Sequence, residues 1–333
     1  MRALVEIGGR LKVKFDKITM DHGSGGKLTL ELIENTFKAK AGLDSAILGD
    51  IAFSTDSHSI KPLFFKGGDI GKLSVSGTVN DLLCVGAKPL YLSSAFIMEE
   101  GFLIEDLEKI VKSMKDETKK ANVKIVCGDT KVVEAGKGFY INTSGIGKII
   151  RPIDGLNIKE GDKIIVTGNI GDHGFAILNE RENFNLTSSL ISDCTELTGL
   201  ILPLIESDLD IHWMRDPTRG GLAMCLNELC YKRDFGVEVF EELVPISDEV
   251  RSISEMLGID PYYSANEGKI VIVANQKDAS KILDVLHKHP LGQNAKIIGE
   301  ITKDHPSKVL LNLSYGAKRL LSMPVVEKMP RIC

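Results

Sequence analysis

The stretch Met214-Arg215-Asp216-Pro217-Thr218-Arg219-Gly220-Gly221-Leu222 begins a helix that we expect over residues 217–232, where leucines recur at helical spacing. Asp216 and Pro217 are typical of the N-cap and the first helical position. Two arginines and two glycines beside them are less expected, because glycine destabilises a helix interior by roughly 1 kcal/mol relative to alanine. They are typical of a helix N-terminus that binds an anion.

The composition indicates a globular protein of two domains. A chain of 333 residues, 43% apolar and 26% charged, is long for one hydrophobic core. The formal net charge of −5 gives no electrostatic reason to expect nucleic-acid binding. The sequence has no secretory signal, and no apolar stretch approaches the roughly 20 residues that span a bilayer, so we expect no membrane association.

The six cysteines are scattered and form no Cys-x-x-Cys pair. This pattern argues against a zinc site and a disulfide framework, and it predicts a reducing, cytoplasmic compartment. Cys333 is the last residue, and two prolines in the final ten residues predict an extended arm. At about 3.3 Å per residue, such an arm reaches roughly 30 Å. Two interpretations stay open: an arm that carries a thiol into a distant pocket, and a frayed end with an accidental cysteine.

Alternating helix and strand patterns predict two α+β domains, divided at Arg151-Pro152-Ile153-Asp154-Gly155. We place the N-terminal domain at 1–150, the C-terminal domain at 151–322 and a mobile tail at 323–333. The predicted helices of the two domains are 27–41, 69–85, 104–121, 172–182, 195–207 and 217–232. The predicted strands are 51–54, 91–98, 123–127, 139–150, 163–167, 269–274, 295–301 and 309–313.

A glycine-rich loop, Asp21-His22-Gly23-Ser24-Gly25-Gly26-Lys27, precedes the first long helix. Glycines let backbone N–H groups approach an anion, and the lysine adds positive charge. The spacing differs from that of a Walker A loop. A phosphate clamp and a flexible helix cap are about equally supported by this motif alone.

Three acidic residues are candidates for one common site. Asp56, Asp81 and Asp129 are each compatible with ordinary turn chemistry, but together they favour a magnesium site, because Mg²⁺ prefers oxygen ligands and bridges to phosphates. Glu267, in Asn266-Glu267-Gly268-Lys269, is either a solvated turn residue or a general base at a strand edge.

The motifs occur in one order: Asp-His-Gly-Ser-Gly-Gly (21–26), Thr-Val-Asn-Asp-Leu (78–82), Gly-Ala-Lys-Pro-Leu-Tyr-Leu-Ser (86–93), Gly-Asp-Thr-Lys-Val-Val (128–133), the 214–222 stretch, Asn-Glu-Gly-Lys (266–269) and a terminal Pro-Arg-Ile-Cys. In this order the chain resembles the HypE family of hydrogenase maturation proteins, over nearly its whole length. The resemblance implies a PurM-like α+β fold, shared with aminoimidazole ribonucleotide synthetase and selenophosphate synthetase. It also implies an N-terminal domain that binds ATP and forms a homodimer.

The resemblance further implies a reaction. ATP drives dehydration of a carbamoyl group on Cys333 to a thiocyanate, which supplies the cyanide ligand for the iron of [NiFe]-hydrogenase. The implied partners are the carbamoyltransferase HypF as carbamoyl donor and the HypC–HypD complex as cyanide acceptor. Phosphorylation activates the thiocarbamate oxygen, which is otherwise a poor leaving group, and Mg²⁺ neutralises charge on the phosphates.

Site residues are carried over by motif match. Glu267 and Lys131 are the candidates for the base that removes the nitrogen protons, and Lys131 requires a lowered pKa to act so. His58 is a weaker catalytic candidate, because a lone histidine after a strand is more often structural. The implied Mg²⁺ ligands are Asp56, Asp81 and Asp216. The implied ATP-binding residues are Gly25, Gly26, Lys27, Asp129, Thr130 and Arg219.

Two other functions remain possible from the sequence. A selenophosphate synthetase has the same fold, but it needs a reactive cysteine or selenocysteine in the glycine-rich loop, and residues 21–27 contain neither. A non-catalytic assembly factor would dock a partner through Pro330-Arg331-Ile332 and need no nucleotide. Phosphate release with selenide distinguishes the first alternative, and ATP affinity distinguishes the second.

Overall fold

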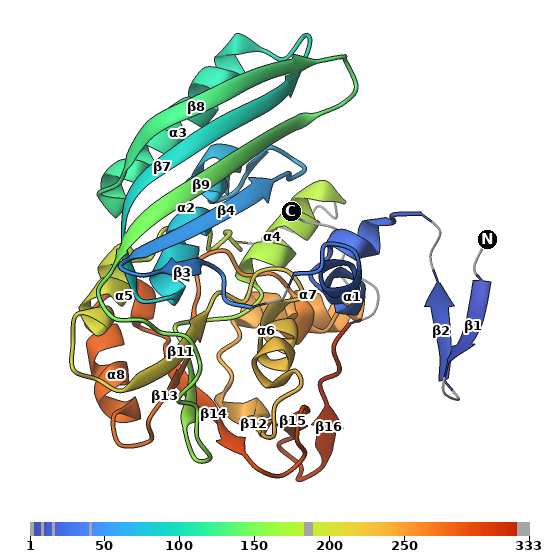
Figure 1. Ribbon diagram of the computed structural model, residues 1–333, viewed down its shortest axis with the longest axis vertical. Coiled ribbons are helices and arrows are strands. Elements are labelled where there is room, and N and C mark those ends of the chain that lie inside the picture. The colour runs from blue at the N-terminus through green and yellow to red at the C-terminus, as the bar shows by residue number, and fades with distance from the viewer. Residues whose placement is uncertain (1–2, 8–9, 15–16, 40–41, 183–188, 325–333) are drawn as a thin grey trace.

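The computed structural model describes residues 3–7, 10–14, 17–39, 42–182 and 189–324. The architecture is α+β, as predicted, with two large sheets and helices packed against them (Figure 1). The predicted tail lies outside the described residues from position 325 onward. The domain limits at 150 and 322 stay a prediction. All strands of the first large sheet end by Ile149, and those of the second begin at Lys163.

The first large sheet contains five strands in the order β3-β4-β9-β7-β8. They are β3 (Ala46–Leu48), β4 (Ile51–His58), β7 (Ala87–Glu99), β8 (Lys124–Val133) and β9 (Phe139–Ile149). β7 and β8 run parallel, and the other neighbours run antiparallel. Helices α2 (Ile70–Cys84) and α3 (Ile104–Ala121) cover one face of this sheet (Figure 1).

Alternation of side chains divides this sheet into two unlike faces. On β9, Phe139, Ile141 and Thr143 are buried, whereas Tyr140 and Ile146 are exposed. Successive side chains of a strand point to opposite faces, so the buried set faces α2 and the exposed set faces away. We call these the inner and outer faces of the first sheet. No helix among the described residues covers the outer face.

The second large sheet contains seven strands in the order β11-β13-β10-β14-β12-β15-β16. They are β10 (Lys163–Val166), β11 (Ile211–Arg215), β12 (Gly236–Phe240), β13 (Val271–Ala274), β14 (Lys296–Thr302), β15 (Val309–Asn312) and β16 (Lys318–Leu320). Its two faces contribute to separate apolar clusters. Helix α6 (Gly221–Cys230) belongs to one cluster. The other contains side chains of α4 (Asp172–Arg181), α5 (Thr198–Ile205), α7 (Asp248–Leu257) and α8 (Ala279–Leu286).

The remaining elements are short. They are the hairpins β1 (Ala3–Ile7) with β2 (Arg10–Lys14) and β5 (Phe64–Phe65) with β6 (Gly68–Asp69), the helix α1 (Lys27–Asn35), and the 3-10 turns η1 (Met20–Gly23), η2 (Glu241–Leu243), η3 (Pro261–Tyr263) and η4 (Pro290–Gly292). An ion pair of 2.9 Å between Glu34 and Lys232 joins α1 to the end of α6. In the described part of the chain, every helix is too short or too polar to cross a membrane.

The helix expected from residue 217 begins four residues later than predicted. Gly220 and Gly221 have φ of +74° and +61°, and α6 begins only at Gly221. This left-handed backbone suits glycine and interrupts the helix. The prediction that Asp216 is an N-cap was therefore wrong, and its side chain is free to serve the site.

Other boundaries also differ. β8 continues through residues 128–131, which were expected in a loop, because pairing with β7 extends to Val133. Helix α1 ends at Asn35 rather than at residue 41. The sequence patterns did not resolve α7 and α8 or the five-residue strands β11 and β12.

Candidate active site

A cleft of about 640 Å³ lies between the first sheet and the second half of the chain. Its walls come from α1, β4, α2, the β11–α6 connection and the segment before β13. The predicted site residues in its walls are Gly25, Asp56, His58, Asp81, Asp216, Arg219 and Glu267. The fold therefore brings together motifs that lie far apart in the sequence.

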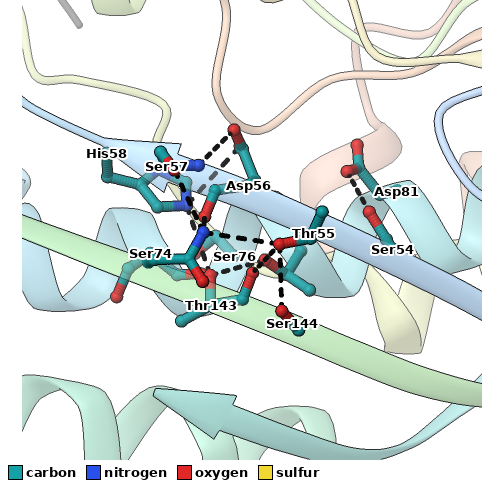
Figure 2. Close-up of polar contacts among 12 residues, drawn as sticks. Ser54, Thr55, Asp56, Ser57, His58, Ser74, Ser76, Asp81, Thr143 and Ser144 are labelled. Carbon is teal, nitrogen blue, oxygen red and sulfur yellow. Dashed lines mark hydrogen bonds and ion pairs between the residues drawn. The ribbon is translucent and has the colours of Figure 1, made fainter. Parts of the chain in front are cut away.

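Three carboxylates meet in this cleft. Asp44, Asp81 and Asp216 each place an oxygen within 4.8 Å of the others, and we call them the acidic cluster. Asp44 precedes β3, Asp81 lies on α2, and Asp216 follows β11. Ser54 donates a hydrogen bond of 2.6 Å to Oδ2 of Asp81 (Figure 2). Sequence reasoning missed Asp44, although its position just before a strand is the kind of position that could have identified it.

The acidic cluster concentrates negative charge in a buried place. Burial raises the pKa of Asp81 and of Asp216, and the neighbouring carboxylates raise both further. Oδ2 of Asp44 is buried and has no hydrogen-bond partner among the described residues. Oxygen ligands, excess negative charge and an unsatisfied oxygen together fit a hard divalent cation such as Mg²⁺.

The two arginines of the 214–222 stretch differ in their surroundings. Arg215 pairs through Nε with Asp44 at 3.2 Å and through Nη2 with Glu228 at 3.0 Å, so it orients a carboxylate of the acidic cluster. Arg219 is exposed in the cleft wall, and its Nη1 donates to the backbone oxygen of Gly23 at 3.4 Å. Of the two, Arg219 is placed to meet an anionic ligand.

Asp56 and His58 lie together on the inner face of β4. Oδ2 of Asp56 is 3.5 Å from Nε2 of His58, and its Oδ1 accepts the N–H of Ser57 at 2.8 Å (Figure 2). Burial lowers the pKa of His58 although the Asp56 charge opposes this, so the neutral imidazole is favoured. Asp56 lines the cleft beside the acidic cluster but is not within the 4.8 Å group.

Glu267 is buried in the cleft wall with 6% exposure, which excludes the solvated turn residue considered above. Burial raises its pKa well above the usual range of a glutamate, and the charges of Asp216 and Asp56 raise it further. Without a cation in the cleft, the neutral carboxylic acid is therefore the favoured form.

The glycine-rich loop meets the last described residue. The N–H of Lys27 donates to the backbone oxygen of Pro324 at 3.1 Å, which satisfies one of the free N–H groups at the start of α1. A Cβ added to Gly26 would lie 2.5 Å from the same oxygen. Gly25 lines the cleft, whereas Gly26 and Lys27 contact the segment that leads into the predicted tail.

Asp129, Thr130 and Lys131 are exposed on β8 and do not line the cleft. Gly128 lies in the same cross-strand row as Asp56, through the pairings of β4, β9, β7 and β8. Asp129 is one residue further along and belongs to the outer face, together with Lys131. Within a single chain, Asp129 thus does not converge with the other aspartates as expected.

The proposed carrier thiol, Cys333, lies outside the described residues. The five other cysteines are free, and all are buried except Cys127, which is exposed on β8. Burial raises the pKa of the Cys84, Cys194 and Cys225 thiols well above the usual range, which disfavours reactive thiolates at these positions.

Comparisons with known proteins match both halves of the chain. Residues 42–149 match the family "AIR synthase related protein, N-terminal domain", and residues 159–312 match its C-terminal domain. A putative hydrogenase expression/formation protein of Methanocaldococcus jannaschii is 47% identical, over 95% of this chain and 100% of its own length. The carbamoyl dehydratase HypE of Cupriavidus necator is 40% identical, over 100% of both chains.

Solved structures give the same picture. A chain in the crystal structure of a HypE–HypF complex superposes with a TM-score of 0.85 and 45% identity, over 90% of this chain and 100% of its own length. The crystal structure of HypE in complex with ATP superposes with a TM-score of 0.82 and 39% identity, over 95% and 100%.

Proposed function

Because the chain belongs to the HypE family of carbamoyl dehydratases, we propose that it uses ATP to dehydrate a carbamoyl group on Cys333 to a thiocyanate. The thiocyanate supplies the cyanide ligand of the iron in [NiFe]-hydrogenase maturation. The observation that carries this proposal is the cleft in which the buried Glu267 lies near the acidic cluster.

The chemistry requires loss of one oxygen and two protons from the group R–S–CO–NH₂. Transfer of the γ-phosphoryl group to the carbonyl oxygen releases ADP and converts that oxygen into a good leaving group, which departs as phosphate. Cleavage of the C–O bond and loss of both N–H protons then leave R–S–C≡N, ADP and inorganic phosphate. The protein must therefore bind the phosphates and place a base near the nitrogen.

Glu267 is the base that the cleft supports. It must be ionised to accept a proton, whereas burial and the Asp216 and Asp56 charges favour its neutral form. A divalent cation on the acidic cluster would neutralise those charges and shift Glu267 toward the carboxylate. Cation binding and base activation are thus coupled in this proposal.

Mg²⁺ would be held by Asp44, Asp81 and Asp216, with Asp56 beside them, and would neutralise charge on the ATP phosphates. Arg219, which is exposed in the cleft wall, would meet the phosphates. His58, neutral and packed against Asp56, orients that carboxylate rather than exchanging protons with substrate.

A homodimer is the second part of the proposal, and the outer face of the first sheet supports it. Cross-strand rows place exposed apolar side chains together on this face, namely Phe53, Ile146 and Tyr91 in one row and Tyr140 and Ile97 in another. β8 is also an exposed edge strand. Such a surface is typical of one that a second subunit covers.

The remaining partners are inferred from the family. The solved HypE–HypF complex supports HypF as a partner of this chain, and its role as carbamoyl donor stays a prediction from the resemblance. The HypC–HypD complex as cyanide acceptor and a cytoplasmic location stay predictions from the resemblance and the cysteine pattern.

The decisive experiment is intact-protein mass spectrometry after incubation with ATP, Mg²⁺ and carbamoyl-loaded HypF. We expect a carbamoyl adduct that then loses the mass of one water, mapped by peptide analysis to Cys333. Cys333→Ala should bind ATP but accept no carbamoyl group. A fully active Cys333→Ala protein, modified at another cysteine, would contradict the proposal.

Oligomeric state is tested separately. Light scattering across micromolar concentrations should give the mass of a dimer. A charge placed in the Phe53 row, such as Tyr91→Glu, should shift the equilibrium toward monomer, whereas the same substitution at exposed Tyr315, on the second half of the chain, should not. A wild-type protein that stays monomeric at all concentrations would contradict the dimer.

A further inference from the structure

A short chain of hydrogen bonds connects helix α2 to Glu267. Nδ2 of Asn80 donates to the backbone oxygen of Thr195 at 3.1 Å, and Oδ1 of Asn80 accepts the N–H of Leu197 at 3.0 Å. The N–H of Thr195 in turn donates to the backbone oxygen of Glu267 at 3.4 Å. The side chain of Asn80 on α2 thus binds the 192–197 segment, and this segment in turn binds the backbone of Glu267.

Asp193 holds the other side of the Glu267 peptide. Its Oδ1 accepts the N–H of Glu267 at 3.0 Å, and its Oδ2 pairs with Lys269 at 3.0 Å. A Cβ added to Gly268 would lie 1.9 Å from the backbone oxygen of Asp193, so the two segments are in tight contact. Both backbone groups of Glu267 are therefore fixed by the 192–197 segment.

Helix α3 secures the same segment a second time. Oε1 of Glu117 accepts the N–H of Glu196 at 2.7 Å, and the Glu117 side chain is buried at 1% exposure. Asn80 is equally buried at 1%. Buried polar side chains whose hydrogen bonds are satisfied rigidify the elements that they connect, here α2 and α3 with the 192–197 segment.

We infer that Asn80 and Asp193 are positioning residues that set Glu267 relative to the acidic cluster. Asn80 directly precedes Asp81, so one turn of α2 fixes both the segment that holds the base and a ligand of the proposed cation. The inference rests on the proposed function. It adds that these hydrogen bonds keep the position of Glu267 fixed relative to the acidic cluster that would hold the cation.

The position of a base matters because small displacements are costly in rate. A shift of about 1 Å at a reacting group can reduce a rate by roughly 10²-fold. Removing Asn80 leaves Glu267 chemically intact and changes only its support. The expected signature is thus a fall in kcat with an unchanged KM for ATP, because Arg219 and the acidic cluster are untouched.

The test compares Asn80→Ala and Asp193→Asn with wild type, using pre-carbamoylated protein and measuring thiocyanate formation against ATP concentration. Each protein dehydrates its own Cys333 once in this assay, so kcat here means the rate constant at saturating ATP and KM the half-saturating ATP concentration. We expect kcat to fall by about 10- to 100-fold in Asn80→Ala, with KM for ATP within about twofold of wild type. Asp193→Asn keeps an oxygen acceptor for the Glu267 N–H and should retain more activity than Asp193→Ala.

Glu196→Ala is the matched control. It lies in the same segment, and its carboxylate accepts the N–H of Thr198 at 2.7 Å, away from Glu267. It should keep the wild-type kcat.

Wild-type kcat in Asn80→Ala, or an equal fall in Glu196→Ala, would overturn the inference while leaving the proposed function standing. Absence of thiocyanate from the wild-type protein would instead contradict the proposed function. If Asn80→Ala fails to fold, the two Asp193 variants still test the inference: it requires a higher kcat in Asp193→Asn than in Asp193→Ala, and equal kcat values would contradict it.

Discussion

The inner and outer faces of the first sheet carry different parts of the expected site. The inner face presents Asp56 and His58 to a cleft where buried carboxylates and Glu267 gather. The outer face presents Asp129 and Lys131 beside uncovered apolar side chains. Strand alternation alone produces this division, because residues an odd number of positions apart point to opposite sides.

A single chain therefore does not bring all of the implied site residues to one cleft. In a monomer, a ligand in the cleft cannot contact Lys131 on the far side of the sheet. In the proposed homodimer, the outer face of one subunit would meet its partner, and we expect β8 residues to approach the partner's cleft. The two candidate bases would then not be equivalent: Glu267 would act within its own chain, and Lys131 would act only through assembly.

The largest expected effect is that of Glu267→Gln, which keeps the size of the side chain but cannot accept a proton at neutral pH. General-base removal typically costs 10²- to 10⁴-fold in rate, so we expect dehydration to fall by about that factor while carbamoyl loading continues. The measurement is accumulation of carbamoylated protein by mass spectrometry. Asp162→Asn, at a buried carboxylate outside the cleft, should dehydrate normally. Thiocyanate formed at the wild-type rate by Glu267→Gln would move the base to the outer face.

A mixing experiment tests the division between the faces directly. Lys131→Met and Glu267→Gln proteins should each be impaired alone. If Lys131 serves the partner's cleft, random exchange of subunits creates heterodimers with one intact site, and roughly one quarter of wild-type activity should return. Two variants of the same cleft, Asp81→Asn with Glu267→Gln, serve as the control and should not complement. No recovery with Lys131→Met would contradict a role for Lys131 in trans.

Much of the fold and of the cleft could be predicted from the sequence, whereas the division between the two faces could not. The motif order predicted the fold, and Asp81, Asp216 and Glu267 do meet in one cleft. What the sequence could not give was the side of the sheet, because the predicted strand stopped at Cys127 and left Asp129 in a loop with free orientation. Only the pairing of β8 with β7 up to Val133 fixes that orientation. Asp44 was missed for a different reason: the strand that follows it, β3, was not predicted, and its closeness to Asp216 joins residues far apart in the sequence.

Smaller effects are expected from the charge of the acidic cluster. The pKa of Asp81 and of Asp216 is raised in the folded protein, so these groups favour folding below the unfolded carboxyl pKa of about 4, and that contribution is lost as pH rises through the raised values. Without Mg²⁺, Tm should therefore fall between pH 5 and pH 8. Mg²⁺ should raise Tm more at pH 8 than at pH 5. Each 1–2 kcal/mol of added unfolding free energy should raise Tm by a few degrees.

Asp81→Asn is the matched variant for this measurement. It removes one charge from the acidic cluster, so without Mg²⁺ it should melt above wild type at pH 8, and it should respond less to Mg²⁺. Asp129→Asn, on the outer face, should behave as wild type in both respects. Equal Mg²⁺ responses in wild type and Asp81→Asn would remove Asp81 from the proposed cation site.

The smallest expected effect concerns where the predicted tail leaves the body of the protein. The carbonyl of Pro324, the last described residue, accepts the Lys27 N–H, and a methyl group added at Gly26 would lie 2.5 Å from the same oxygen. The φ of Gly26 is −81°, so Gly26→Ala creates a clash without backbone strain and should destabilise by about 1–3 kcal/mol. Gly42→Ala, with nothing within 4 Å of the added Cβ, is the control and should be close to neutral.

Because the displaced segment leads to Cys333, Gly26→Ala should also slow dehydration of pre-carbamoylated protein more than it changes ATP affinity. Unchanged stability and unchanged dehydration in Gly26→Ala would show that the glycine-rich loop does not guide the tail to the inner face.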